Sequence, residues 1–96
     1  MLPGELLEAY SRQHPDEVLL VQVEQTGARD EVMVFRGFSS SLSQATAFNP
    51  DVPVIQAGAR ILGIDRLRGP YNPDKPEYLQ QGMTWETFHA EFCLDL

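Results

Sequence analysis

The stretch Glu31–Ser43 reads EVMVFRGFSSSLS and runs from a dense apolar segment directly into a serine-rich one. Its first half is rich in valine and phenylalanine, which pack well on a pleated surface, so residues 31–38 predict a strand. Residues 17–25 read EVLLVQVEQ and predict a second strand just upstream. Together they predict a hairpin over residues 17–38, around which the rest of the chain is placed.

A two-residue turn is expected to join these strands, with Gly27 at the first central position, where a type II′ turn favours glycine. This turn places Val21 opposite Val34 and Val23 opposite Val32 on one face of the hairpin. A slip of one residue would exchange the two faces. Because both faces carry apolar side chains near the start of the first strand, we expect something to pack on each side there.

Length and cysteine content point to a small intracellular domain. The chain has 96 residues, which suits one domain with a single modest core. Its one cysteine, Cys93, has no partner for an intrachain disulfide, and the amino terminus shows no secretory signal pattern. No apolar run approaches the length of a membrane span. We therefore expect a soluble, cytoplasmic protein.

The charge balance narrows the range of partners. Fourteen acidic residues oppose seven basic ones, for a net charge of −7, which argues against non-specific binding to nucleic acid or to an anionic membrane. Residues 60–75 hold four basic and two acidic side chains. Arg60, Arg66 and Arg68 have two interpretations: they neutralise the acidic domain internally, or they form a face that contacts a partner.

Two further segments predict regular elements. Residues 3–13 carry apolar side chains at helical spacing and predict a short helix that ends by Pro15. Residues 59–68 read ARILGIDRLR and predict a third strand, antiparallel to the hairpin. Gly63 within this strand predicts a bulge or a close backbone approach.

The carboxy-terminal segment predicts a helix over residues 84–92, with Thr84 as its N-cap. Trp85, Phe88 and Phe92 fall on one stripe of this helix. We expect the stripe to cover one face of the sheet and to supply a large share of the core.

Residues 77–81 are expected to form a helical turn closed by Gly82. His89 and Cys93 stand one helical turn apart but lack two further ligands nearby, so no metal and no cofactor are expected. The predicted fold class is α+β: a curved antiparallel sheet of three to four strands, or a partial small barrel, with a short amino-terminal helix and a packed carboxy-terminal helix.

The serine-rich segment has two interpretations. In the first, its hydroxyls cap backbone groups in a turn and connection over residues 39–58, and Ser43 caps a short helical turn. In the second, it binds a small anion, either a phosphate compound or a short nucleic-acid segment, with help from arginines. The second interpretation requires the third strand to lie beside the second. Its candidate residues are Arg36, Ser39, Ser40, Ser41, Arg66 and Arg68.

Residues 69–76 read GPYNPDKP and predict a rigid, extended loop that exposes Tyr71, or else a connector across the end of the domain. No catalytic motif and no phosphate-binding loop is recognisable in the sequence, so we do not expect an enzyme. The leading interpretation is a non-enzymatic interaction or assembly factor that binds a protein through this loop and the arginine face. The sequence leaves the oligomeric state and the identity of the partner open.

Four blocks of the sequence form a combined pattern: Gly37–Leu42, Ile61–Tyr71, Glu77–Leu79 and Gly82–Glu86. Within residues 17–92 they resemble a family of small domains of unknown function from cyanobacteria and, fused to transit peptides, from plant chloroplasts. The resemblance implies a cytoplasmic or stromal protein linked to photosynthetic physiology. It brings no catalytic residues to this chain.

Overall fold

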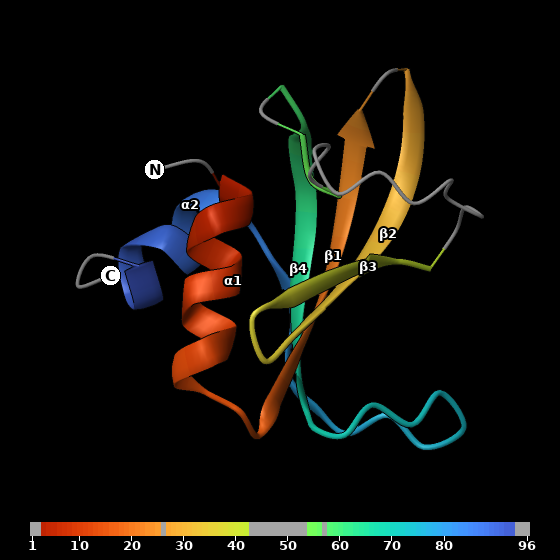
Figure 1. Cartoon of the computed structure of the whole chain (residues 1–96), viewed down its shortest axis with the longest axis vertical. Helices are drawn as coiled ribbons and strands as arrows, with labels where there is room; N and C mark the ends of the chain where they lie inside the picture. Colours follow the sequence, from red (N-terminus) through yellow and green to blue (C-terminus); the bar gives the residue numbers. More distant parts are fainter. Residues whose placement is uncertain (1–2, 26, 43–53, 57, 94–96) are drawn as a thin grey trace.

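The computed structural model describes residues 3–25, 27–42, 54–56 and 58–93. Five strands form one antiparallel sheet in the order β3-β2-β1-β4-β5, and two helices pack on one of its faces (Figure 1). The elements are α1 (Pro3–Gln13), β1 (Glu17–Gln25), β2 (Ala28–Phe35), β3 (Phe38–Ser41), β4 (Arg60–Arg68), β5 (Tyr78–Met83), α2 (Trp85–Phe88) and the π-helical turn η1 (His89–Cys93). The predicted α+β class is confirmed. The sheet has more strands than predicted, and its edges β3 and β5 leave it open, so it is not a barrel.

Helix α1 has the bounds that the sequence predicts. Pro3 suits the first turn, where a backbone N–H would have no helical partner. Leu6, Leu7 and Tyr10 are buried against the sheet. The helix ends before Pro15, because proline disfavours helical geometry at the preceding residue.

Strands β1 and β2 form the predicted hairpin, but in a different register. Val21 lies opposite Val32 and not Val34. Gly27, with a φ of 76°, takes the second position of the two-residue loop, where the sequence predicted the first. The resulting shift is two residues, so every side chain keeps its predicted face, since side chains alternate with a period of two.

A second tight turn joins β2 to β3. Arg36 and Gly37 both have positive φ, 49° and 87°, the combination of a type I′ hairpin turn. The prediction of a serine turn is therefore wrong over residues 39–41, which pair with β2 as an edge strand. The predicted cap at Ser43 lies outside the described residues.

Strand β4 adds to the free side of β1, antiparallel as predicted. Gln22 pairs with Gly63 but Val23 pairs with Ile61, so Leu62 is the extra residue of a bulge. The bulge predicted at this point is confirmed.

Strand β5 occupies the segment that the sequence predicted as a helical turn. It pairs antiparallel with β4, with two register irregularities. Gly82 has a φ of 67° and lies inside this irregular strand, not after a helix. The prediction failed because the free edge of β4 offers hydrogen-bond partners that local sequence does not reveal.

The carboxy-terminal helix begins as predicted. The Thr84 hydroxyl oxygen accepts a hydrogen bond from the backbone N–H of Thr87 at 3.1 Å. Phe88 is fully buried, and Trp85 and Phe92 are partly buried against the same cluster, so the predicted aromatic stripe does face the sheet. None of the helices in the described residues is long and apolar enough to cross a membrane.

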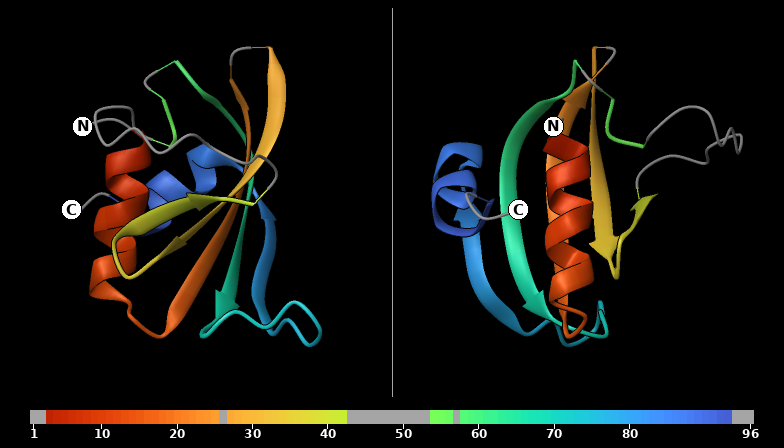
Figure 2. Two further views of the ribbon diagram at one scale, coloured as in Figure 1. Left: turned by 45° about the vertical axis from the view of Figure 1, so that its right-hand side comes forward. Right: turned by 60° about the vertical axis from the view of Figure 1, so that its left-hand side comes forward.

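The sheet is curved (Figure 2). It separates two unequal apolar clusters. The larger lies under the helices and includes residues of α1, β1, β2, β4 and α2. The smaller lies on the opposite side, which we call the open face because no described helix covers it. It consists of Val18, Leu20 and Leu67, with Met33, Phe35 and Tyr71 packed against them.

Candidate functional site

Arg66 lies on the helix side of the sheet and not on an exposed arginine face. Its Nε donates hydrogen bonds to Glu17 Oε1 at 2.9 Å and to Tyr10 Oη at 3.2 Å. One terminal nitrogen forms an ion pair with Glu17 at 2.9 Å, and the other donates to Gln80 Oε1 at 3.1 Å. The guanidinium lies 4.7 Å from the centroid of the Phe92 ring. These contacts support internal neutralisation, since Arg66 ties β4 to α1, β1, β5 and η1.

Tyr10 completes the same cluster. Its hydroxyl donates to Glu17 Oε1 at 2.8 Å, and its ring stacks on His14 with centroids 4.1 Å apart. The ring also contacts Phe88 and Phe92 in edge-on geometry. Burial and the hydrogen bond to Glu17 raise the pKa of Tyr10 to about 12. A hydroxyl held protonated in this way is not suited to act as a base at neutral pH, so the cluster is structural.

Arg36, in the turn after β2, and Arg68, at the end of β4, lie near the same end of the sheet. Arg36 Nε donates to the carbonyl oxygen of Pro15 at 3.2 Å, and its guanidinium lies 4.8 Å from the centroid of the Phe35 ring. Both arginines are exposed. They are available to a partner, but Arg66 does not join them.

The serine segment is placed against acidic groups. Ser39 Oγ donates to Glu8 Oε2 at 2.8 Å, and Ser41 Oγ donates to both carboxylate oxygens of Asp30 at 2.9 Å. Ser40 is exposed. Because two of these hydroxyls already bind carboxylates, the local charge opposes an anionic ligand.

The strand order also separates the groups that an anion site would need. The third strand of the sequence prediction, over residues 59–68, is β4, and β1 lies between it and β2. The anion site required these two strands to lie side by side, and they do not. Arg66, Leu19, Val34 and Ser39 occupy successive positions of one row across the sheet. Three strand spacings put the backbones of Arg66 and Ser39 about 14 Å apart. The predicted site residues therefore do not gather in one place.

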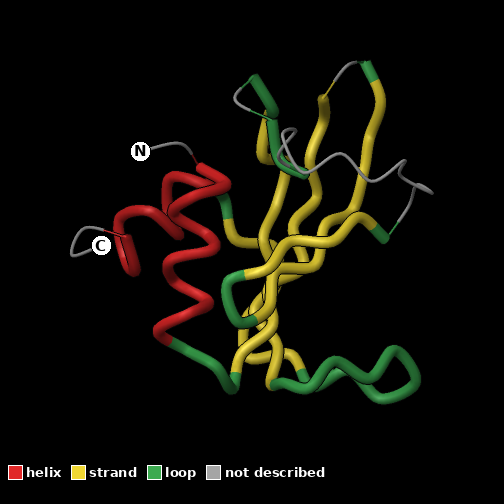
Figure 3. The backbone as a smooth tube through the Cα atoms, in the orientation of Figure 1, coloured by secondary structure: helices red, strands yellow, loops and turns green. Residues whose placement is uncertain are grey.

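The loop over residues 69–76 is turned and not extended as predicted (Figure 3). The Asn72 carbonyl oxygen accepts from Lys75 N at 3.2 Å, and Asn72 Oδ1 accepts from Asp74 N at 3.0 Å. Tyr71 is half-buried in the open-face cluster, whereas the three prolines are exposed. The loop thus presents its prolines to solvent and uses its tyrosine to cover the sheet.

Two exposed side chains that sequence reasoning missed continue this loop into β5. Tyr78 is 43% exposed and Leu79 is 51% exposed. The predicted helical turn obscured them, although tyrosine is enriched in β-strands. We call the combined patch the loop–β5 surface: Pro70, Pro73, Pro76, Tyr78 and Leu79.

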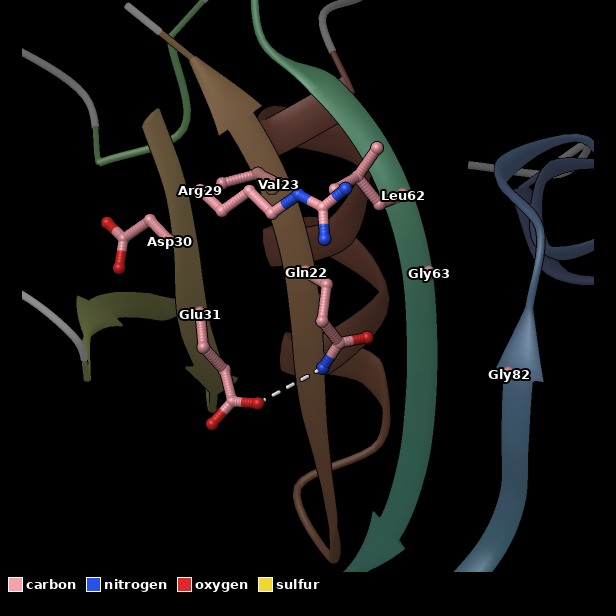
Figure 4. Close-up of a pocket in the computed structure, with 8 residues that line it drawn as sticks. All are labelled: Gln22, Val23, Arg29, Asp30, Glu31, Leu62, Gly63 and Gly82. Carbon is pink, nitrogen blue, oxygen red and sulfur yellow. Dashed lines mark hydrogen bonds between the residues drawn. The ribbon is translucent and has the colours of Figure 1, made fainter. Parts of the chain in front are cut away.

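A hollow of about 510 Å³ lies on the open face, at the end farther from Tyr71 (Figure 4). We call it the open-face hollow. In the middle of the hollow, Gln22 Nε2 donates a hydrogen bond to Glu31 Oε2 at 3.2 Å. The Arg29 side chain extends across β1 toward Leu62. Its lining consists of Gln22, Val23, Arg29, Asp30, Glu31, Leu62, Gly63 and Gly82. Sequence reasoning could not find it, because the lining comes from two pairs of strands, β1 with β2 and β4 with β5, that are far apart in the chain.

No group of three or more His, Cys, Asp or Glu within the described part of the chain is arranged to hold a metal ion.

Comparison with known proteins places the chain in a family. A family described as Domain of unknown function (DUF7734) matches residues 4–92. The chain belongs to this family. No curated protein and no solved structure matched the chain.

Proposed function

We propose that the chain is a non-enzymatic protein-binding module that serves as an accessory or assembly factor. The observation that carries the proposal is the loop–β5 surface, where the exposed side chains of Tyr78 and Leu79 follow a loop with three exposed prolines. Strand β5 carries no charged side chain over its whole length. Adjoining exposed apolar groups are typical of protein–protein contacts, and tyrosine is enriched at their centres.

The partner is expected to contact side chains and not to add a sixth strand. Two register irregularities interrupt β5, and bulges of this kind turn a sheet edge away from further pairing. The exposed prolines lack a backbone donor as well. Docking onto Tyr78 and Leu79 therefore fits this edge better than strand addition.

The charge of the chain indicates which kind of partner it meets. A net charge of −7 favours association with a protein of opposite net charge, which electrostatic attraction steers toward the complex. The resemblance to domains of cyanobacteria and chloroplasts supports a partner in photosynthetic physiology and a cytoplasmic or stromal location.

The test is capture of proteins from a lysate of the native source by the wild-type chain and by a Tyr78→Ser, Leu79→Ser variant. We expect the variant to lose one captured protein by about tenfold or more, as removal of central interface residues does. The identified protein is then purified, and its affinity for both chains is measured directly.

Leu42→Ser provides the matched control, because Leu42 is 44% exposed at the opposite edge of the sheet. It should capture the same protein as the wild type, and both variants should retain the wild-type circular dichroism spectrum. Equal losses in the two variants, or no selective loss in either, would contradict the proposal.

A further inference from the structure

We propose that the open-face hollow binds a small, neutral, planar heterocycle that has hydrogen-bond donors and acceptors along its edge. The site goes beyond the proposed function, since it does not overlap the loop–β5 surface. Its volume of about 510 Å³ is typical of small-molecule sites, which span about 300 to 1,000 Å³.

The floor of the hollow lacks side chains where β4 and β5 pass, at Gly63 and Gly82 (Figure 4). The positive φ of Gly82 accounts for glycine at that position. Gly63 has no such requirement: its φ lies outside the left-handed region, and an added Cβ would meet only Gln22 Oε1, at 3.2 Å, on a flexible side chain. Gly63 adjoins the bulge at Leu62, where glycine is common, and its missing side chain also leaves room for a ligand to approach the backbone closely.

The polar groups of the hollow form an adjacent donor and acceptor pattern. Gln22 offers its amide in the centre, with Nε2 held by Glu31 and Oε1 on the side of Gly63. Arg29 brings guanidinium donors above it, and its side chain makes no hydrogen bond or ion pair with the described residues. An edge that contains both an N–H and a carbonyl group complements this pattern.

Charge and shape then select a neutral ring. The lining directs one cation, Arg29, and one carboxylate, Glu31, into the hollow, whereas the Asp30 carboxylate accepts from Ser41 on the other side of the sheet. These charges balance, and the net charge of −7 disfavours an anion. Leu62 and the bare floor of glycine backbone provide apolar surface for the faces of a flat ring.

Theophylline and caffeine are suitable probes, because both are neutral planar bicyclic rings and differ by one methyl group that replaces the ring N–H of theophylline. Each is titrated to about 10 mM into the isotope-labelled full chain, a range that detects millimolar dissociation constants. We expect saturable NMR shifts at the amides of Gly63 and Gly82 and at the side-chain amide of Gln22. Caffeine should bind about threefold or more weakly, because it leaves an acceptor of the hollow without a partner.

Gly63→Val tests the site by filling its floor, with only the flexible Gln22 side chain having to move. Valine suits a strand, so thermal stability should be kept, while its side chain fills the floor and lowers the theophylline affinity by about tenfold or more. Gly58→Val is the matched control, because an added Cβ there meets nothing within 4 Å. If Gly63→Val does not fold, Gln22→Leu takes its place and should abolish the preference for theophylline over caffeine.

Three results would overturn the proposal: no saturable shift with either ring, equal theophylline binding by Gly63→Val and the wild type, or shifts with N-acetyltryptophanamide alone. The last would show that the hollow receives an aromatic side chain of a partner. Gly63→Val should leave the protein capture of the proposed function unchanged, so each proposal can fail without the other.

Discussion

The two faces of the sheet are built from the same strands, yet they differ in how they are closed. On the helix side, α1 and α2 cover the sheet, and even the charged Arg66 is paired with Glu17 at 2.9 Å. On the open face, the loop over residues 69–76 covers one end through Tyr71, and a hollow occupies the other.

Rows across the open face show how its character changes along the strands. One row, near the loop, is apolar from edge to edge: Phe38, Phe35, Val18, Leu67 and Tyr78. Two rows away, Glu31, Gln22 and Gly63 lie side by side and supply polar groups or no side chain at all. The comparison teaches that stability should depend mainly on the helix side, whereas the proposed ligand site lies on the open face.

The largest effect should come from removing the centre of the helix-side core. Phe88 is fully buried, so Phe88→Ala should lower the free energy of unfolding by about 3 to 5 kcal/mol. Phe38→Ala is the matched control, because Phe38 is 77% exposed, and it should cost less than about 0.5 kcal/mol. Urea unfolding of both variants measures the difference, and similar losses would refute the contrast between the faces.

A second effect, of intermediate size, follows from the raised pKa of Tyr10. Its value of about 12 in the folded chain exceeds the ordinary 10.0, so folding favours the protonated hydroxyl. That contribution is fully present below pH 10 and is lost as the pH rises from 10 to 12, by about 2 to 3 kcal/mol. Tyr10→Phe should remove this loss from unfolding curves recorded across the alkaline range. The same alkaline slope in both proteins would show that Tyr10 is not its source.

The smallest effect should come from the cover of the open face. Tyr71 is half-buried over a cluster of three buried side chains, so Tyr71→Ala should lower the free energy of unfolding by about 1 to 2 kcal/mol. The measurement is again urea unfolding, beside Phe88→Ala. A loss as large as that of Phe88→Ala would mean that the open face is a second core and not a partly covered surface.

Much of the secondary structure could be predicted because it depends on local pattern. The helical spacing before Pro15, the alternation within β1 and β2 and the cap at Thr84 are properties of neighbouring residues, and the structure agrees with all three. The serine segment and residues 77–81 were mispredicted because both became strands only by pairing with a neighbour. The local sequence does not show which strand such a segment will pair with.

The candidate sites could be predicted far less well. The sequence left Arg66 either to neutralise the domain internally or to form a contact surface, and its pairing with Glu17 under the helices supports the first interpretation. The loop was expected either to expose Tyr71 or to cross the end of the domain, and Tyr71 packs on the open face. The open-face hollow and the exposed pair Tyr78 and Leu79 were not foreseen.

The sequence by itself determined the α+β class, the two helices, three of the five strands and the face on which each hairpin side chain lies, because alternation and helical spacing act over a few residues. Only the tertiary structure decided that β4 lies beside β1, that β3 and β5 form the edges and that none of the described helices covers one face of the sheet. Strand order and helix placement depend on contacts between residues far apart in the chain, which compete for the same edges and faces. Those contacts, and not the local pattern, place Arg66 under the helices and leave the hollow on the opposite face of the sheet.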